Sequence, residues 1–253
     1  MATYTVTNAV LNNASLFDVF SRTGAGSGSG QSIFVITNTD GTVTTYTGSN
    51  LTWNGATASA GTLTSIVRRS SDGTIIYDQI TNFSAGVNDS FAVIWNAAGQ
   101  AGRAGYIFSG ADTHDGSSGN DFFRGYNGVD TFNGGSGNDA VRYDNDSLLS
   151  GGGAAIIVNL SASTQMGVAS NRASDGFGNF DILNSIEEAV GSGGADFFFG
   201  SSTYNFFSGR GGADTYDGGN TVAFFNPGGT FPGTDWNWVD YRLDGARPAS
   251  TSR

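Results

Sequence analysis

The chain has no cysteine, no lysine, three prolines and a single histidine. Without cysteine it can form neither a disulfide nor a thiolate metal site. The single histidine, together with the lack of a G-x-S-x-G turn and of an H-E-x-x-H motif, argues against a serine-triad hydrolase and a zinc protease. A Gly/Ser-rich segment at residues 25–30 is not followed by lysine, so we expect a flexible loop there rather than a phosphate-binding loop.

Long apolar runs are also missing, so no stretch is expected to span a membrane. Residues 1–10 lack the basic start and apolar run of a signal peptide. The net charge is −11, which argues against a nucleic-acid partner. Of the 22 acidic residues only two are Glu, and short Asp side chains suit fixed ligand positions in turns.

Glycine is abundant, with 40 residues, yet 38% of the chain is hydrophobic and 19 residues are Phe. This composition favours many short strands joined by tight turns over disorder. At 253 residues the chain is long enough for one or two domains with a substantial core.

Three nine-residue units follow one another from Gly116 to Arg142, with the sequences GSSGNDFFR, GYNGVDTFN and GGSGNDAVR. Glycine holds the first and fourth places of each unit, aspartate the sixth and an apolar residue the eighth. Glycine permits a positive φ and leaves backbone carbonyls free to turn inward. The last three places suit a short strand whose eighth-place side chain enters the core.

A degenerate fourth unit at residues 107–115 precedes this block, with Gly110 and Asp112 at the fourth and sixth places. His114 holds its eighth place, where we expect a core residue rather than a catalytic one. After a lapse, the pattern resumes in phase with three units at residues 191–217. In the middle one of these, Asn205 replaces the sixth-place aspartate, which predicts a weaker site or none.

Two units make one coil of 18 residues, so sixth-place aspartates should stack one coil apart. Carboxylates held that close repel each other unless a cation lies between them. Their hard anionic oxygens suit Ca²⁺ better than a soft metal. The predicted stacked pairs are Asp112 and Asp130, Asp121 and Asp139, and Asp196 and Asp214.

The segments outside the repeats are expected to form further β-structure and caps. Residues 1–100 read as a β-rich N-terminal domain, with hairpin signals at Asp40-Gly41 and at residues 71–73, and end in a predicted capping helix at residues 86–99. In the spacer, residues 143–190, strands are predicted at 155–160 and 182–190. Residues 221–253 are expected to cap the far end of the roll.

The repeats resemble the repeats-in-toxin (RTX) family of secreted calcium-binding proteins, over roughly residues 107–220. The spacer resembles the D-x-L-x-x-I-E segment that separates repeat blocks in this family, with Asp181, Leu183, Ile186 and Glu187 in the corresponding places. The resemblance implies an all-β fold with a parallel β-roll, here joined to a mostly antiparallel N-terminal region. It also implies several bound Ca²⁺ ions, export by a type I system with a signal in the C-terminal tail, and folding outside the cell.

The calcium ligands that the resemblance implies are turn carbonyls and the sixth-place aspartates. Asp144 and Asp146 are placed to close the last loop of the first block. The candidate metal-site residues are Gly110, Asp112, Gly116, Ser118, Gly119, Asp121, Gly125, Asn127, Gly128, Asp130, Gly134, Ser136, Gly137, Asp139, Asp144, Asp146, Gly191, Gly193, Gly194, Asp196, Asn205, Gly209, Gly211, Gly212 and Asp214.

Three functions remain open from the sequence. The first is a non-enzymatic surface-layer, matrix or self-assembling protein, favoured by aromatic residues at outward strand places: Phe122, Phe197, Phe199 and Phe206. The second is a carbohydrate-binding adhesin module, with one of the tryptophans Trp53, Trp95, Trp236 and Trp238 stacking on sugar. The third is a carbohydrate-acting enzyme, but Glu187 and Glu188 would point to opposite faces of one strand and could not share a substrate.

Overall fold

The repeat units alternate between two β-sheets that enclose a common core. The computed structural model describes residues 3–6, 14–15, 27–38, 40–54, 57–82, 105, 107–219 and 237–239. In this part of the chain, sheet A contains, in spatial order, β17 (Thr215–Asp217), β15 (Phe197–Phe199), β11 (Ile157–Asn159), β12 (Arg172–Ser174), β13 (Phe180–Asn184), β9 (Thr131–Asn133), β7 (Thr113–Asp115), β1 (Thr3–Val6), β6 (Ile76–Thr81), β5 (Thr57–Arg69), β4 (Val43–Asn54) and β3 (Ser27–Thr37). Sheet B contains β18 (Asn237–Val239), β16 (Asn205–Ser208), β14 (Glu188–Val190), β10 (Ala140–Arg142), β8 (Asp121–Phe123) and β2 (Ala14–Ser15).

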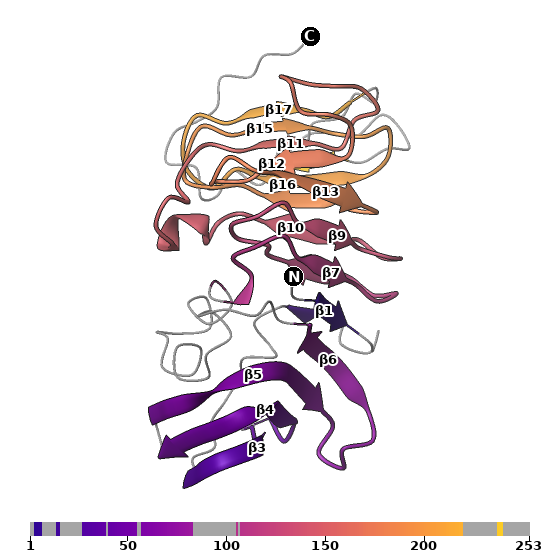
Figure 1. The fold of residues 1–253 in the computed structure, drawn as a ribbon. Coiled ribbons are helices and arrows are strands. Elements are labelled where there is room, and N and C mark those ends of the chain that lie inside the picture. Colours follow the sequence, from indigo (N-terminus) through magenta and orange to yellow (C-terminus); the bar gives the residue numbers. More distant parts are fainter. Residues whose placement is uncertain are drawn as a thin grey trace.

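Strands one coil apart pair in parallel, as the 18-residue coil predicts. β7 pairs with β9, β8 with β10, and β15 with β17. The strands therefore stack one above another (Figure 1). The eighth-place residues point inward and are fully buried, with Phe123, Phe132, Val141 and Phe198 all at 0% exposure. The predicted all-β fold with a parallel roll is confirmed.

The N-terminal region extends sheet A of the roll. β3, β4, β5 and β6 form an antiparallel array at one end of the molecule (Figure 1). β1 joins this array to the roll, because it pairs antiparallel with β6 and parallel with β7. The buried residues of both parts form one hydrophobic cluster, which runs from Phe34 and Leu51 to Phe132 and Phe198.

Two predictions for local structure were wrong. The predicted loop at residues 25–30 is partly strand, because β3 begins at Ser27. The single strand predicted at residues 182–190 is two strands in different sheets, β13 and β14. Ser185 separates them with a φ of 51°, and this left-handed conformation turns the chain from one sheet to the other.

Some predicted elements lie outside the described residues. They include the capping helix at residues 86–99 and, apart from β18, the C-terminal cap at residues 221–253. β18 pairs in parallel with β16 and so adds a strand to sheet B. Within the described segments, no helix has the length and apolarity that a membrane crossing requires.

A buried ion pair that the sequence analysis did not anticipate joins β5 and β6. Arg68 donates from Nε to Asp78 Oδ1 at 2.9 Å and from Nη2 to Asp78 Oδ2 at 3.2 Å. The two residues are 5% and 0% exposed, and the guanidinium also lies over the ring of Tyr77. Removing one partner of such a pair leaves an uncompensated charge in the core.

We therefore expect Arg68→Ala to lower the free energy of unfolding of the N-terminal sheet by roughly 3–5 kcal/mol. Urea denaturation in excess Ca²⁺ measures this loss, and Arg69→Ala, at the neighbouring half-buried arginine, serves as the control. Equal losses in the two variants would contradict a special role for the Arg68–Asp78 pair.

Candidate metal centre

The sixth-place aspartates stack through a hydrogen bond that recurs from coil to coil. The backbone N–H of each donates to the Oδ1 atom of the aspartate 18 residues further on. The pairs and their N···Oδ1 distances are Asp112 to Asp130, 2.8 Å; Asp121 to Asp139, 2.8 Å; and Asp196 to Asp214, 2.9 Å. All three predicted pairs are thus brought together.

Glycines make this close stacking possible. A Cβ atom at first-place Gly125 would collide with the carboxylate of Asp130 in the same unit. Fourth-place Gly128 and Gly137 have φ values of 150° and 126°, and Cβ atoms there would collide with carbonyl oxygens of the coil before. The turns therefore bring carboxylates and backbone carbonyls into a space that any larger residue would fill.

Several of the stacked carboxylates are buried and have an oxygen atom without a hydrogen-bond partner. Asp121, Asp130 and Asp139 are all 0% exposed. Oδ1 of Asp121 and Oδ2 of Asp130 and Asp139 have no hydrogen-bond partner. Buried anionic oxygens beside inward carbonyls are the ligand set that Ca²⁺ takes, so the residues present fit this ion. Since no three acidic or histidine side chains of the described residues converge on one point, carbonyls would have to complete each coordination shell.

Burial shifts the acidity of these groups. It raises the pKa of Asp139 to about 7 and that of Asp196 to about 6, with smaller contributions from neighbouring carboxylates. Burial and the charge of Asp181 also raise the pKa of Asp130. Each of these ionised carboxylates is costly in the absence of a cation.

Serine at the second place holds the carboxylate of its own unit, a role that the sequence analysis missed. The backbone N–H groups of Ser117 and Ser192 donate to Oδ2 of Asp121 and Asp196, both at 2.7 Å. In the broken unit, Ser201 N–H donates to Asn205 Oδ1 at 3.3 Å instead. The spacing of Ser and Asp four residues apart could have indicated this contact.

Asn205 fills the aspartate position without its charge. Its Nδ2 group donates to the carbonyl oxygen of Thr203 at 2.6 Å. The carbonyl oxygen of Thr203 thus accepts a hydrogen bond from the Asn205 amide and is less available to a cation. This arrangement agrees with the expectation of a weaker site in this unit.

The other candidate ligands lie in the turns before the strands. Gly211 stacks over Gly193 one coil back, and Gly212 over Gly194. Asn127 Oδ1 accepts a hydrogen bond from Asn179 Nδ2 at 3.1 Å. The remaining turn candidates, which would act through their carbonyls, are Gly110, Gly116, Ser118, Gly119, Gly134, Ser136, Gly191 and Gly209.

Asp144 does not fit the role predicted for it. Its Oδ1 atom lies 2.6 Å from Arg124 Nη2, and its Oδ2 atom lies 3.1 Å from both Arg142 Nη2 and Arg210 Nη1. Three guanidinium groups already neutralise this carboxylate, so we leave Asp144 out of the proposed calcium ligands. The arginines come from three different units, which is why no local pattern revealed the cluster.

Asp146 lies in the spacer, at the start of the short 3-10 helix η3 (Asp146–Leu148). Its Oδ2 atom accepts the N–H of Gly176 at 3.2 Å, and its buried Oδ1 atom has no hydrogen-bond partner. Burial raises the pKa of Asp146 to about 8. It therefore bridges two parts of the spacer.

Two residues considered for other functions belong to the core. His114 is 0% exposed, and its ring lies 4.8 Å from that of Phe108 and 4.9 Å from that of Phe132. Burial lowers its pKa to about 3, so it is neutral. Trp53 is 7% exposed, with its ring 4.0 Å from that of Phe34. Trp53 is therefore not available for stacking on a sugar.

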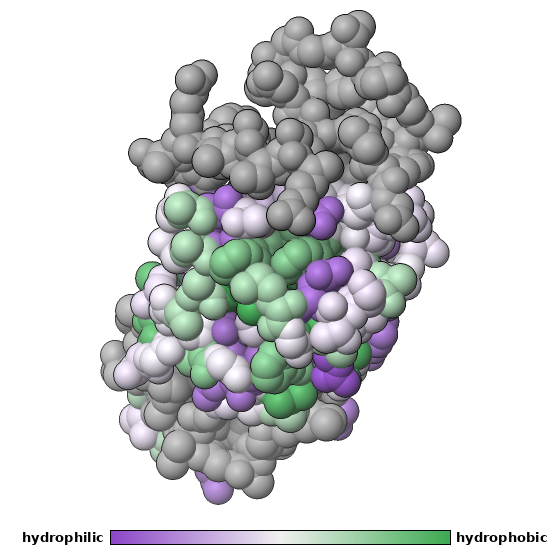
Figure 2. Space-filling model, turned by 90° about the horizontal axis from the view of Figure 1, so that it is seen from above, coloured by the Kyte–Doolittle hydropathy of each residue, from purple (hydrophilic) through white to green (hydrophobic). Residues whose placement is uncertain are grey.

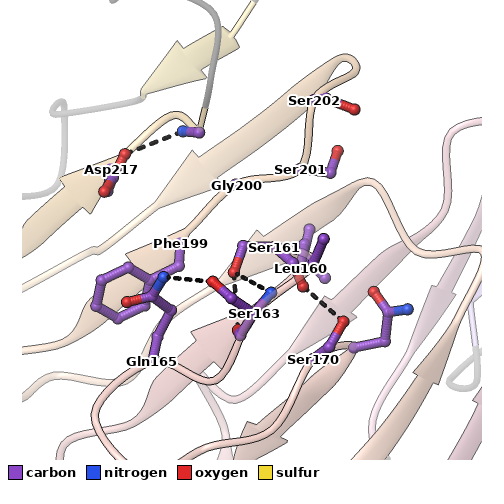
Figure 3. Close-up of a pocket in the computed structure, with 13 residues that line it drawn as sticks. Leu160, Ser161, Ser163, Gln165, Ser170, Phe199, Gly200, Ser201, Ser202 and Asp217 are labelled. Atoms are coloured by element: carbon purple, nitrogen blue, oxygen red, sulfur yellow. Dashed lines mark hydrogen bonds between the residues drawn. The ribbon is translucent and has the colours of Figure 1, made fainter.

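A cavity of about 490 Å³ lies beside β11, β15 and β17, and Figure 3 shows its lining. Its polar groups largely bond to one another. Ser170 Oγ donates to the carbonyl of Ser161 at 2.6 Å, and Gln165 Nε2 donates to Ser163 Oγ at 3.1 Å. Asp217 is the only acid among the described residues that line it, so it lacks the carboxylate pair of a glycosidase.

The rows of aspartates lie in two segments that match a known family of repeats. The family model of the RTX calcium-binding nonapeptide repeat matches residues 106–141 and 190–220, with four copies. The chain carries RTX repeats. Such repeats bind Ca²⁺, several ions per repeat domain. No curated protein and no solved structure matched the chain.

The stability of the RTX repeats should depend on pH, and the direction of this dependence should reverse when Ca²⁺ is bound. The raised pKa values of Asp139, about 7, and Asp146, about 8, mean that the folded state without Ca²⁺ favours the protonated acids. Their contribution to stability is complete below the unfolded pKa near 4 and is lost as the pH rises through 7–8. We expect the melting temperature of the roll in calcium-free buffer to fall as the pH rises above 5, and its melting transition to be absent by pH 8.

With saturating Ca²⁺ the trend should be the opposite, since the ion binds the ionised form. Thermal melts followed by circular dichroism measure both series, the first in metal-stripped buffer and the second with excess CaCl₂. A calcium-free melting temperature that rises between pH 5 and pH 8 would contradict the assignment.

Proposed function

We propose that this protein is secreted, folds when Ca²⁺ binds its β-roll, and acts without catalysis as a structural, self-assembling component of a cell surface or matrix. The observation that carries the calcium-dependent folding is the stack of buried aspartates, in which Asp121, Asp130 and Asp139 each have an oxygen atom without a hydrogen-bond partner. RTX repeat proteins are typically secreted, which supports the extracellular location.

The proposed sites lie between successive turns, at the three stacked aspartate pairs of the repeats. Asp112 and Asp130 hold one site, Asp121 and Asp139 a second, and Asp196 and Asp214 a third. Turn carbonyls of the same coils add further oxygen ligands. The bound ion supplies the positive charge that allows the carboxylates to be ionised inside the roll.

Binding of this kind makes folding depend on calcium. Extracellular calcium modules bind with a Kd of roughly 10⁻⁴ to 10⁻³ M. At ten times Kd, each site adds about 1.4 kcal/mol to stability. Three or four such sites supply on the order of 5 kcal/mol, which is comparable to the whole stability of a typical domain. Scarce calcium would therefore leave the roll unfolded, and millimolar calcium would fold it.

Removal of calcium should unfold the roll. We expect excess EGTA at pH 8 to abolish the part of the far-UV β signal that comes from the roll, and added CaCl₂ to restore it, because buried ionised aspartates then regain their counter-ions. Circular dichroism across a calcium titration measures this, with MgCl₂ as the control. Unchanged spectra and melting in EGTA would rule out calcium-dependent folding.

Support for self-assembly comes from the free edge of sheet A. Strand β3 has a pairing partner only on its β4 side among the described residues. On its outward face Ile33 is 54% exposed and Val35 is 52% exposed. A long edge strand with exposed β-branched residues is suited to pairing with another copy of the chain. The predicted outward aromatics give weaker support, since Phe122, Phe197, Phe199 and Phe206 are only partly exposed.

The other end of the roll supports association as well. Among the described residues, β17 is the last strand of sheet A at this end, and Tyr216 stacks on Phe198 with ring centroids 5.1 Å apart. Figure 2 looks onto this end and shows an apolar area with polar side chains along part of its edge. Two ends with different surfaces favour head-to-tail contacts.

We expect the double variant Ile33→Lys/Val35→Lys to remain monomeric at millimolar Ca²⁺, where the unmodified chain assembles. Charge on an edge strand opposes strand addition. Light scattering and electron microscopy measure the assembly, and calcium titration checks that binding is unchanged. Ile75→Lys places the same charge on another exposed apolar residue, 44% exposed in the turn before β6, and should still assemble.

A strictly monomeric unmodified chain at high concentration in millimolar Ca²⁺ would contradict the self-assembly proposal. The carbohydrate-binding alternative has less support, because Trp53 is a core residue and the polar groups of the cavity bond largely to each other.

A further inference from the structure

Two acidic residues of the spacer continue the rows of sixth-place aspartates. The backbone N–H of Asp130 donates to Asp181 Oδ1 at 2.9 Å. The N–H of Asp139 donates to Glu187 Oε2 at 3.0 Å. These bonds repeat the contact between Asp121 and its stacked partner in the repeats. The spacer therefore supplies a carboxylate one coil beyond the last aspartate of each row.

The backbone of the spacer also follows the repeat at this point. β13 pairs in parallel with β9, and β14 with β10. The residues opposite Phe132 and Val141 are Leu183 and Ala189, which are 2% and 0% exposed and so occupy the inward eighth place. The spacer thus forms a true coil of the roll although it lacks the glycine pattern.

Ser185 takes the place of the first glycine in this coil. The N–H of Gly134 donates to the carbonyl of Asn184 at 2.9 Å, as the N–H of Gly116 donates to that of Asn133 at 2.8 Å. Ser185 has a φ of 51°, whereas the first-place glycines Gly116 and Gly134 do not have a positive φ, so the chain leaves this position in a different direction.

Glu187 follows a shorter turn than the sixth-place aspartates do. In the repeat, four residues separate Gly134 from Asp139, whereas one separates Ser185 from Glu187. The register is nevertheless kept, because Ala140 pairs with Glu188 as it pairs with Phe122, so Glu187 lies opposite Asp139 as Asp121 does. From this position Glu187 Oε2 accepts the N–H of Asp139.

Oxygen atoms converge at the step between these two coils. A Cβ atom on Gly134 would collide with the carbonyl oxygen of Ser185 and lie 2.6 Å from Asp139 Oδ2. Around Gly116, the carbonyl oxygen of Gly134 and Oδ2 of Asp121 have the same arrangement. Asp139 Oδ2 is buried and has no hydrogen-bond partner. The step into the spacer therefore reproduces the oxygen arrangement of the step inside the repeats.

We propose that Glu187, with Asp139 and the Ser185 carbonyl, binds a Ca²⁺ ion outside the nonapeptide pattern, and that Asp181 and Asp130 form the parallel site in the other row. This inference rests on the proposed calcium function and extends it. The two sites attach the spacer to the first repeat block. They therefore make this coil of the spacer part of the same calcium-dependent unit as the first block.

The two sites differ in strength. Asp181 Oδ2 accepts a hydrogen bond from the hydroxyl of Tyr143 at 3.0 Å, which leaves fewer lone pairs for a metal ion. Glu187 has no such phenol partner among the described contacts. The Glu187 site is accordingly the stronger of the two.

The test compares two adjacent glutamates in the full chain. Glu187→Gln keeps an oxygen that can accept from Asp139 N–H but removes the charge. Glu188→Gln removes the same charge from a half-buried neighbour that bonds to Tyr204 instead. Equilibrium dialysis and calorimetry with Ca²⁺ give the number and affinity of the sites, and Asp139→Asn serves as the reference for loss of a repeat site.

We expect Glu187→Gln to lose one bound ion or to weaken one site at least tenfold, while Glu188→Gln matches the unmodified chain. If Glu187→Gln binds normally while Asp139→Asn loses ions, Glu187 is only a hydrogen-bond acceptor. The spacer sites are then overturned, and the proposed function stands. If Asp139→Asn also binds normally, both fail.

A variant that does not fold still gives an answer. Glu187→Asp keeps the charge on a shorter side chain. If Glu187→Gln shows no β signal at any calcium concentration and Glu187→Asp recovers it, the carboxylate charge is required, as the site predicts. Failure of both variants to fold would show that shape alone matters and would overturn the proposal.

Discussion

The roll depends on one recurring contact, in which a backbone N–H donates to the carboxylate one coil further on. This bond satisfies a donor that would otherwise be buried without a partner, and it fixes the 18-residue spacing. It also places each carboxylate inside the fold beside the next one. An unpaired charge in such a position costs several kcal/mol. Stacking and ionisation are therefore in conflict at neutral pH, and the Ca²⁺ ions that we propose between the turns would remove this conflict.

The two rows of acidic residues end differently because the spacer is asymmetric. It inserts β12 and β11 into sheet A between β13 and β15, whereas in sheet B β14 lies directly between β10 and β16. In the row beside sheet A, the N–H that donates to Asp196 belongs to Ile156, at 2.8 Å. In the row beside sheet B, Glu187 is followed by Asn205. The row beside sheet A is thus interrupted at Ile156 and regains its aspartates in the second block, whereas the row beside sheet B loses its charge at Asn205.

The features that could be predicted from the sequence are those that a short period determines. The position of a residue within the nine-residue unit determines whether its side chain points inward. Because two units make one coil of 18 residues, the sequence also determines which aspartates stack. The rest depends on contacts over long separations. Asp144 meets three arginines that only the coiling brings together. The single strand predicted at residues 182–190 was wrong because Ser185 adopts a conformation that its sequence does not reveal. β3 extends into a Gly/Ser segment because the 12-residue strand β4 gives it a partner.

Strand β1 has a position that constrains the order of folding. It lies near the start of the chain, yet its parallel partner β7 begins at Thr113. Closing a loop of more than a hundred residues is slow, and no gain comes until both strands are formed. The antiparallel array β3–β6 needs only neighbouring segments and can form by itself. The join between the array and the roll is therefore the late step, and it completes only after the first coil offers β7 as a template.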